Sequence, residues 1–506
     1  MVDTVKIEPD IDYSISPRSI TTSLTTTPFK PASITYWEYE RPKRYYAKVG
    51  AGYPLNSIVD LYAGSQHSSV GYMTGFVNHN GRYSTISNNY NERNPSQQIH
   101  TSLGFAAGAY TGKHILEGAI QYNNDLWSRY ATKDSGDEHP LYNDVGINVR
   151  YGDNFIDMSR INFDIGTNVG YFTSRSGYSN TRLGAAISVG GAIGGGEFIT
   201  SVGYDYIGGS DDYNNNGLNL NAKYQIKTKH GGEVVLGVGF INDQISCNIY
   251  DDSDNYLLPE LRIRVGAEDG FVPFLEVAGE LNRANYSALT DINPYIKSGL
   301  YAPKSSVDYR SRIGVAGFAK DQKAHYQLYA DYTYTLNALY WLYVEMNNTA
   351  GGVDNYYTLS QGKSQRYRFG GDIEYTPSRR LNFTASCAYS IYTEDKAIGL
   401  DIAQPKIEAA LKFSYKQRKW AISGGGELEG ERCWSMVSGE DGKAYSVNKK
   451  TYAPTAVNLM VAMEWYTNSR LTLFAEGDNL ACAKIYSWGG YREYGVNFTL
   501  GAKIQF

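Results

Sequence analysis

The sequence predicts an all-β protein, a transmembrane antiparallel β-barrel of about 22 strands, and three observations support this fold class. The final residues, 496–506, alternate apolar and polar side chains up to the carboxyl terminus, as a strand with two different faces does. The chain has 46 Tyr and 53 Gly but 15 Pro, which suits the aromatic girdles and tight turns of such barrels. No run of about 18 apolar residues occurs, so a helical membrane span is excluded.

The terminal strand explains how the barrel would close. Its apolar side chains share one face: Val496, Phe498, Leu500, Ala502, Ile504 and Phe506. A sheet inside a membrane cannot leave an unpaired edge, because lipid offers its backbone no hydrogen bonds. We therefore expect this strand to close the barrel against the first strand.

The chain begins with a different composition. Residues 1–30 are rich in Ser, Thr and Pro, which predicts an extended periplasmic arm without a core of its own. The barrel is then expected over residues 31–506, with Ala32–Tyr39 as its first strand. No basic segment followed by an apolar one opens the sequence, so we expect that a signal peptide was removed.

Strands and connections alternate along the rest of the chain. Apolar residues at every second position mark strands near 366–375, 380–391, 407–415 and 457–465. Short turns are predicted at 194–196, 230–232, 268–270, 320–322, 376–378, 416–418 and 467–469. Long polar loops are predicted at 80–98, 132–140, 208–215, 244–255, 284–304, 339–364, 394–401 and 431–451. In outer-membrane barrels the short turns are periplasmic and the long loops extracellular.

Charged residues on the polar face of these strands are expected to line the lumen. They are Arg262, Arg264, Glu276, Glu280, Asp308, Arg310, Arg312, Arg366, Arg368, Asp372 and Glu374. Two interpretations are open: a ladder of cross-strand ion pairs that stiffens the wall, or an electrostatically lined pore. The mixed signs favour the ladder, because a selective channel would be expected to carry charges of one sign.

Several classes of function find no signal in the sequence. A net charge of −5 and a pI near 5.9 argue against a nucleic-acid partner. The seven His are isolated, no G-x-S-x-G motif occurs, and the calcium-like start at Asp212–Gly217 has Lys223 where a Glu is needed. We therefore predict no catalytic residue, no metal and no cofactor. A disulfide between Cys433 and Cys482 is left open.

The carboxyl end resembles that of TonB-dependent outer-membrane receptors. The stretch Leu471–Leu480, followed by Tyr486, Gly490–Tyr491, Gly495 and the closing Phe506, is similar to the end of their barrels. The resemblance implies a barrel of 22 strands in the bacterial outer membrane. Those receptors carry a plug domain before the barrel, and the residues ahead of the first expected strand show no globular pattern. The chain therefore resembles the barrel without its plug.

Two hypotheses of function follow. In the first, the chain is a non-catalytic structural component of an outer-membrane complex for transport, secretion or barrel assembly, with its lumen occluded. Its partners would be outer-membrane lipids and lipoproteins or periplasmic proteins, bound through the loops and the amino-terminal arm. The alternative is an outer-membrane transport protein, either receptor-like or a passive channel for polar solutes. An enzyme is not predicted.

Overall fold

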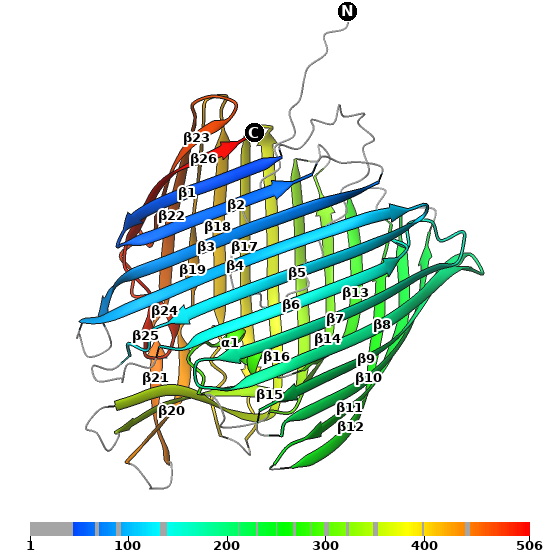
Figure 1. Cartoon of the computed structure of the whole chain (residues 1–506), viewed down its shortest axis with the longest axis horizontal. Coiled ribbons are helices and arrows are strands. Elements are labelled where there is room, and N and C mark those ends of the chain that lie inside the picture. Colours follow the sequence, from blue (N-terminus) through cyan, green and yellow to red (C-terminus); the bar gives the residue numbers. More distant parts are fainter. Residues whose placement is uncertain are drawn as a thin grey trace, which may run out of the picture.

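In the computed structural model the chain forms one closed antiparallel β-barrel (Figure 1). The structure describes residues 44–65, 70–87, 93–131, 139–210, 212–228, 231–248, 250–266, 270–283, 285–297, 303–319, 323–347, 353–396, 399–440 and 446–506. Successive strands pair from β1 to β19, and the ring continues through β22, β23 and β26 back to β1. Of the 24 strands that this sheet contains in the described chain, β20 and β21 lie outside the ring, which leaves 22 in the wall. The predicted fold class is confirmed.

The strands of the wall differ in length but follow the chain in order. Their bounds are β1 Tyr45–Tyr53, β2 Asn56–Gly64, β3 Gly71–Ser87, β4 Arg93–Thr111, β5 His114–Trp127, β6 Leu141–Gly152, β7 Asn162–Ser174, β8 Ser179–Ile193, β9 Gly196–Gly209, β10 Asn214–Lys227, β11 Glu233–Ser246, β12 Asp251–Arg264, β13 Phe271–Asn282, β14 Ser306–Phe318, β15 Ala324–Asn347, β16 Val353–Ser378, β17 Leu381–Thr393, β18 Ile407–Lys416, β19 Trp420–Glu429, β22 Ala456–Tyr466, β23 Leu471–Asp478 and β26 Asn497–Gln505. The remaining elements are α1 Tyr286–Ile292, β20 Arg432–Glu440, β21 Ser446–Ala453, β24 Tyr486–Trp488 and β25 Tyr491–Arg492. Among the described residues, no helix has the length and the hydrophobicity that crossing a bilayer requires.

The alternation of apolar and polar residues in the sequence corresponds to an alternation of more exposed and less exposed side chains along the strands of the wall. Along β22 every second side chain is exposed on the outside, ending with Met463 and Trp465, while the side chains between them are less exposed. The exposed large apolar residues of the other strands follow the same period, for example Leu183 on β8 and Leu220 on β10. Apolar side chains therefore cover the outer face, as contact with lipid requires.

The seam of the ring lies between β1 and β26. Gly50 faces Gly501 across this pair, and the ring of Phe474 on β23 fills the space that a side chain at either glycine would occupy. The ammonium groups of Lys48 and Lys503 lie 4.7 and 5.6 Å from the centre of that ring. The expected first strand at Ala32–Tyr39 lies outside the described residues, and the ring of 22 strands is complete without it.

The two chain ends of the barrel meet at one rim, which we call the terminal rim. The amide of Tyr45 donates to the carbonyl of Phe506 over 2.9 Å, and both ends lie at the top of Figure 1. The predicted short turns at 194–196, 416–418 and 467–469 join strands at this rim. Gly194 and Gly195 have φ angles of 59° and 85°, which a tight hairpin needs and glycine adopts without strain. The prediction of a turn at 376–378 is displaced, since β16 runs to Ser378. The other three predicted turns include residues outside the described ranges.

The opposite rim, here called the far rim, carries the longer connections. The predictions of loops at 80–98, 244–255, 339–364 and 431–451 are wrong for most of their residues, which belong to paired strands. Beyond the membrane a strand can carry polar side chains on both faces, so polarity there does not indicate a loop. Two of these extended strands, β15 and β16, have 24 and 26 residues, and the β20–β21 hairpin pairs in parallel with β15.

Candidate functional site

Two connections at the far rim pack together across the opening of the barrel. We call them the lid: residues 285–297, which include α1, and residues 479–496, which include β24 and β25. They share one buried, largely aromatic cluster with Phe172 on β7, Tyr343 on β15 and Trp434 on β20. Because β7 and β15 are not neighbours in the ring, the contacts of the lid reach from one side of the opening to the other; Figure 1 labels α1, β24 and β25 toward the rim opposite the chain ends.

Stacked tyrosines hold the two halves of the lid together. The rings of Tyr295 and Tyr491 lie parallel with their centres 3.5 Å apart, and the ring of Tyr130 meets both edge-on. All three side chains are fully buried. Burial of this kind raises the pKa of the Tyr295 and Tyr491 hydroxyls above its usual value, so both stay neutral.

Hydroxyl groups of two wall residues, and of Tyr130 in the connection after β5, bind the backbone of the lid. Tyr142 donates to the carbonyl of Pro294 over 2.8 Å, Tyr130 to that of Arg492 over 2.9 Å, and Tyr357 to that of Gly489 over 2.8 Å. In the other direction, the hydroxyl of Tyr491 reaches the side-chain oxygen of Asn355 at 2.5 Å. Loop carbonyls that would otherwise be buried without partners are thus satisfied, which fixes the lid in one position.

The helix of the lid carries one carboxyl in an acidic setting. The side chain of Asp291 reaches solvent, yet protein surrounds it on most sides. This loss of water, and then the carboxylates of Asp125 and Asp144, raise the pKa of Asp291 to about 6; Arg182 and His100 oppose the shift. Arg182 in turn donates to the hydroxyl of Ser287 in α1 over 2.8 Å and pairs with Asp144.

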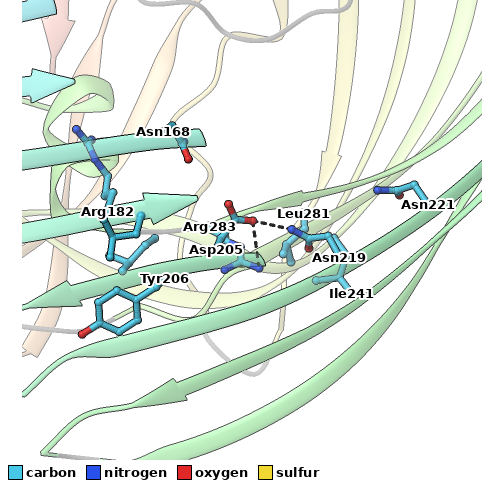
Figure 2. A pocket seen from close by; sticks show the side chains of 11 residues that line it. Asn168, Arg182, Asp205, Tyr206, Asn219, Asn221, Ile241, Leu281 and Arg283 are labelled. Atoms are coloured by element: carbon cyan, nitrogen blue, oxygen red, sulfur yellow. Dashed lines mark hydrogen bonds and ion pairs between the residues drawn. The ribbon is translucent and has the colours of Figure 1, made fainter. Parts of the chain in front are cut away.

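A polar pocket of about 460 Å³ lies in the inner wall next to the root of the lid (Figure 2). Its polar side chains come from one strand after another: Asn168 on β7, Arg182 on β8, Asp205 on β9, and Asn219 and Asn221 on β10. Arg283, the residue that follows β13, completes the set, and Ile207, Ile241 and Leu281 supply apolar surface. The pocket therefore lies beside Arg283, just before the lid residues 285–297 begin.

Arg283 is built into this wall. Its Nη1 donates to Asn215 over 3.2 Å, while its Nη2 lies 3.9 Å from a carboxylate oxygen of Asp205 and 4.0 Å from one of Asp243. A Cβ at Gly217 would stand 1.3 Å from that Nη2, so only glycine leaves room for the guanidinium. The amide of Asn219 donates to Asp205 over 2.6 Å. Figure 2 shows Asp205 between Asn219 and Arg283, joined to both by dashed lines.

Some of the charges predicted to line the lumen form cross-strand pairs. Glu276 lies 3.7 Å from Arg262 and 3.1 Å from Arg264. Arg312 binds Asp331 over 2.8 Å, and this pair is buried. Such contacts are those that the ladder interpretation requires, and the assignment of the whole set to the lumen stays a prediction.

Other predicted residues have different neighbours. Arg366 lies 4.0 Å from Asp331, and Arg368 binds Glu408 over 2.8 Å. Glu374 accepts a hydrogen bond from Asn382, whereas Asp372 stands opposite Gln327 and Ser386. Glu280 faces Asp308 across the β13–β14 pair, so two like charges are opposed there, and Arg310 stands opposite Ala278 and Thr333. The sequence reasoning missed Asp331, which the same alternation along β15 would have found.

The terminal strand β26 pairs with β1. Phe498, Leu500, Ile504 and Phe506 are exposed on the outer face, and Val496 directly precedes β26. The question of a disulfide is answered, because Cys433 and Cys482 are free thiols. Within the described ranges, no group of three or more His, Cys, Asp or Glu could hold a metal ion.

Comparison with solved structures places this barrel among known folds. It matches the FrpB iron transporter from Neisseria meningitidis with a TM-score of 0.71 at 10% sequence identity, over 92% of this chain and 82% of that one. It matches FpvA of P. aeruginosa, in complex with a ferric pyoverdine, with a TM-score of 0.68 at 10% identity, over 92% and 72% of the two chains. The siderophore receptor PirA from Acinetobacter baumannii gives 0.66 at 11% identity, over 91% and 80%.

Comparison of sequences alone finds none of these proteins. No family model matches the chain, and no curated protein matches it. The resemblance at the carboxyl end nevertheless extends to the whole barrel, while part of each receptor has no counterpart in this chain. The chain has the β-barrel fold of the TonB-dependent receptors of the bacterial outer membrane.

Proposed function

We propose that this chain is an outer-membrane transport protein that admits a small polar solute, rather than a structural scaffold. The observation that carries the proposal is a lid made of the chain's own loops, which lies across one opening beside a polar pocket. A scaffold needs a closed lumen only to preserve the permeability barrier. A transporter needs, in addition, a polar surface that a solute can reach when the lid moves.

The structural neighbours support transport over scaffolding. They include a copper transporter, the FrpB iron transporter and the ferric-catecholate import receptor Fiu of E. coli. One neighbour forms a complex with pyocin S2, so a protein that binds this chain is also within the proposal. At 10 to 12% identity these names suggest transport as a class of function and do not identify the solute.

Solute uptake by cells tests the proposal. The full chain would be expressed in the outer membrane of a strain that lacks its general porins, and uptake of labelled polar solutes would be compared with that of cells without the chain. We expect uptake that saturates with concentration for at least one solute, since a pocket with finite affinity limits the flux. A passive channel would instead give a flux that rises linearly.

Purification in mild detergent tests the scaffold hypothesis on the same cells. A protein that travels with the chain in fixed proportion, together with uptake no faster than in control cells, would refute the transport proposal. Saturable uptake by the chain without a bound protein would refute the scaffold.

A further inference from the structure

We propose that the free edge of β12 at the far rim, residues 251–257, receives an extended basic segment of another protein as an added β-strand. The inference does not depend on the transport function proposed above. It rests on the strand pairing of β12, on the packing that holds its unpaired half in place, and on the charges along that half. We call residues 251–257 the β12 edge.

The ladder between β12 and β13 covers only part of β12. With β11, β12 pairs along its whole length, from Asp251 to Arg264. Among the described residues, its pairing with β13 stops at Glu260. The preceding residue, Pro259, has no N–H to donate to β13, so the ladder loses a bond at the point where it ends.

The odd-numbered residues of β12 direct their backbone groups at this unpaired side. The amide of Val265, directly after β12, donates to the carbonyl of Pro273 on β13 over 3.1 Å. On the other side, the amide of Cys247 donates to the carbonyl of Tyr250 over 3.0 Å, just beyond the ends of β11 and β12. Because backbone groups alternate between the two sides of an antiparallel strand, the N–H and C=O of Asn255 point away from β11.

Side-chain exposure along β12 changes where the pairing with β13 ends. The residues paired with β13 are all half-buried, whereas every second residue before them is exposed: Asp251, Ser253, Asn255, Leu257 and Pro259. Leu257 is 62% exposed and stands opposite Phe240 of β11 on the apolar outer face. Lipid offers backbone groups there no hydrogen bonds, so an added strand that supplies them would be stabilised.

Side chains on the inner face hold the unpaired half of β12 in position. Tyr256 and Leu258 are buried there. They belong to one apolar cluster with Ile241 of β11 and Val307 of β14. Gly279 on β13 permits this close approach, since a Cβ at that position would stand 2.8 Å from the Cα of Leu258. The β12 edge is therefore already ordered as a strand, and binding would order only the incoming segment.

The charges of the β12 edge favour a basic partner. Asp251 is exposed, and Asp252 pairs with Lys304. Asp254 accepts a hydrogen bond from the hydroxyl of Tyr256 over 3.0 Å. Three carboxylates therefore stand beside one ammonium group. A second copy of the chain would bring the same carboxylates together, whereas a segment with Lys or Arg at alternate positions would place cations beside them.

The test uses the full chain, purified in a non-ionic detergent, and three fluorescent peptides about as long as the β12 edge. One peptide alternates Lys and Val, and one alternates Glu and Val. The third is the Lys/Val peptide with every backbone nitrogen methylated, so it keeps its charge and loses its backbone donors. We expect saturable binding of the Lys/Val peptide by fluorescence anisotropy, and binding of the other two that is weaker by about tenfold or more.

Two results with these peptides would overturn the proposal. Comparable affinity for the methylated peptide would show that charge alone attracts the Lys/Val peptide. No saturable binding of the Lys/Val peptide would show that the β12 edge accepts no strand.

Variants place the binding at the β12 edge. Asn255→Pro removes an N–H from the edge and leaves the bonds to β11, so it should weaken binding of the Lys/Val peptide by about tenfold or more. Asn255→Ala keeps that N–H and is the matched control, with unchanged affinity. Asp251→Lys leaves the backbone as it is and should reverse the preference between the Lys/Val and Glu/Val peptides. Equal affinity in Asn255→Pro and Asn255→Ala, or an unreversed preference in Asp251→Lys, would refute the proposal.

Light scattering on the purified chain tests a second copy as the occupant. We expect a monomer in detergent, because two β12 edges would oppose like charges. A dimer that Asn255→Pro dissociates and Asn255→Ala does not would show that β12 pairs with itself, and would overturn the assignment of a basic partner.

Discussion

Replacing Tyr491 by alanine should undock the lid without unfolding the barrel. The ring of Tyr491 is fully buried, stacks on Tyr295 at 3.5 Å and places its hydroxyl 2.5 Å from Asn355. Truncating a buried aromatic side chain to alanine costs about 3–5 kcal/mol. The wall depends on its own strand pairing, so the loss should fall on the docking of the lid.

The structure gives the size of the expected effect. Each tenfold change in the population of the open lid corresponds to about 1.4 kcal/mol of docking free energy. A docking free energy that is weaker by about 3–5 kcal/mol therefore raises this population by two to nearly four powers of ten. Tyr491→Phe keeps the ring and removes the hydroxyl, so its effect should be about 1–3 kcal/mol. The lipid-facing Tyr204→Ala serves as a matched control and should leave the lid unchanged.

Cleavage by trypsin after Arg492 reports the open lid, because the bond lies in β25 of the lid and its carbonyl accepts from Tyr130. When opening and closing are faster than cleavage, the cleavage rate follows the open population. Tyr491→Ala should therefore be cleaved at least about a hundredfold faster than the wild type, and its conductance in planar bilayers should rise. A cleavage rate equal to that of the wild type, in a variant that still migrates as a folded barrel, would refute the reasoning.

Three further predictions concern the seam, the wall and the lid. Phe474→Ala should lower the unfolding temperature of the barrel, measured on a gel as the temperature at which the band of the folded protein disappears. The reason is that a buried ring at the seam is lost, at a cost of about 3–5 kcal/mol. An unchanged unfolding temperature would contradict this prediction. Asp331→Asn should destabilise the wall by about 3–5 kcal/mol by leaving Arg312 buried without its carboxylate, whereas the double variant Arg312→Met with Asp331→Leu should cost less, as denaturant titration of both variants and the wild type would show. The raised pKa of Asp291, about 6, means that the docked lid holds this proton more tightly than the open lid, so docking should weaken as pH rises from about 4 to above 6. Asp291→Asn should remove that dependence from the tryptic cleavage after Arg492, and an unchanged pH profile would show that another group controls it.

The interior pairs illustrate how far alternation alone could be taken. It places Arg262 and Arg264 beside Glu276, and the structure contains both contacts. It does not predict that Glu280 stands opposite Asp308, the register the structure has, in which two like charges oppose each other. Alternation fixes the face of a residue, but the partner depends on register, and register depends on turns and bulges that the sequence does not display.

The lid could not be predicted from the sequence, for a related reason. Its first half was predicted as the polar loop 284–304, with no indication of where it folds. Tyr130 and Arg492 touch although 362 positions separate them, and no period or motif links such segments. The pocket is hidden in the same way, since Asn168 on β7, Asp205 on β9 and Arg283 after β13 are far apart in the chain and form no pattern along it.

The sequence by itself determined the barrel, its closing strand and the rim that carries the short turns, because a boundary between lipid and water acts on every second residue of every strand. The tertiary structure alone decided what closes the opening and which polar groups share the pocket. Those contacts depend on the width of the ring and on which strands face each other across it, and both are set only when all 22 strands of the described wall have paired.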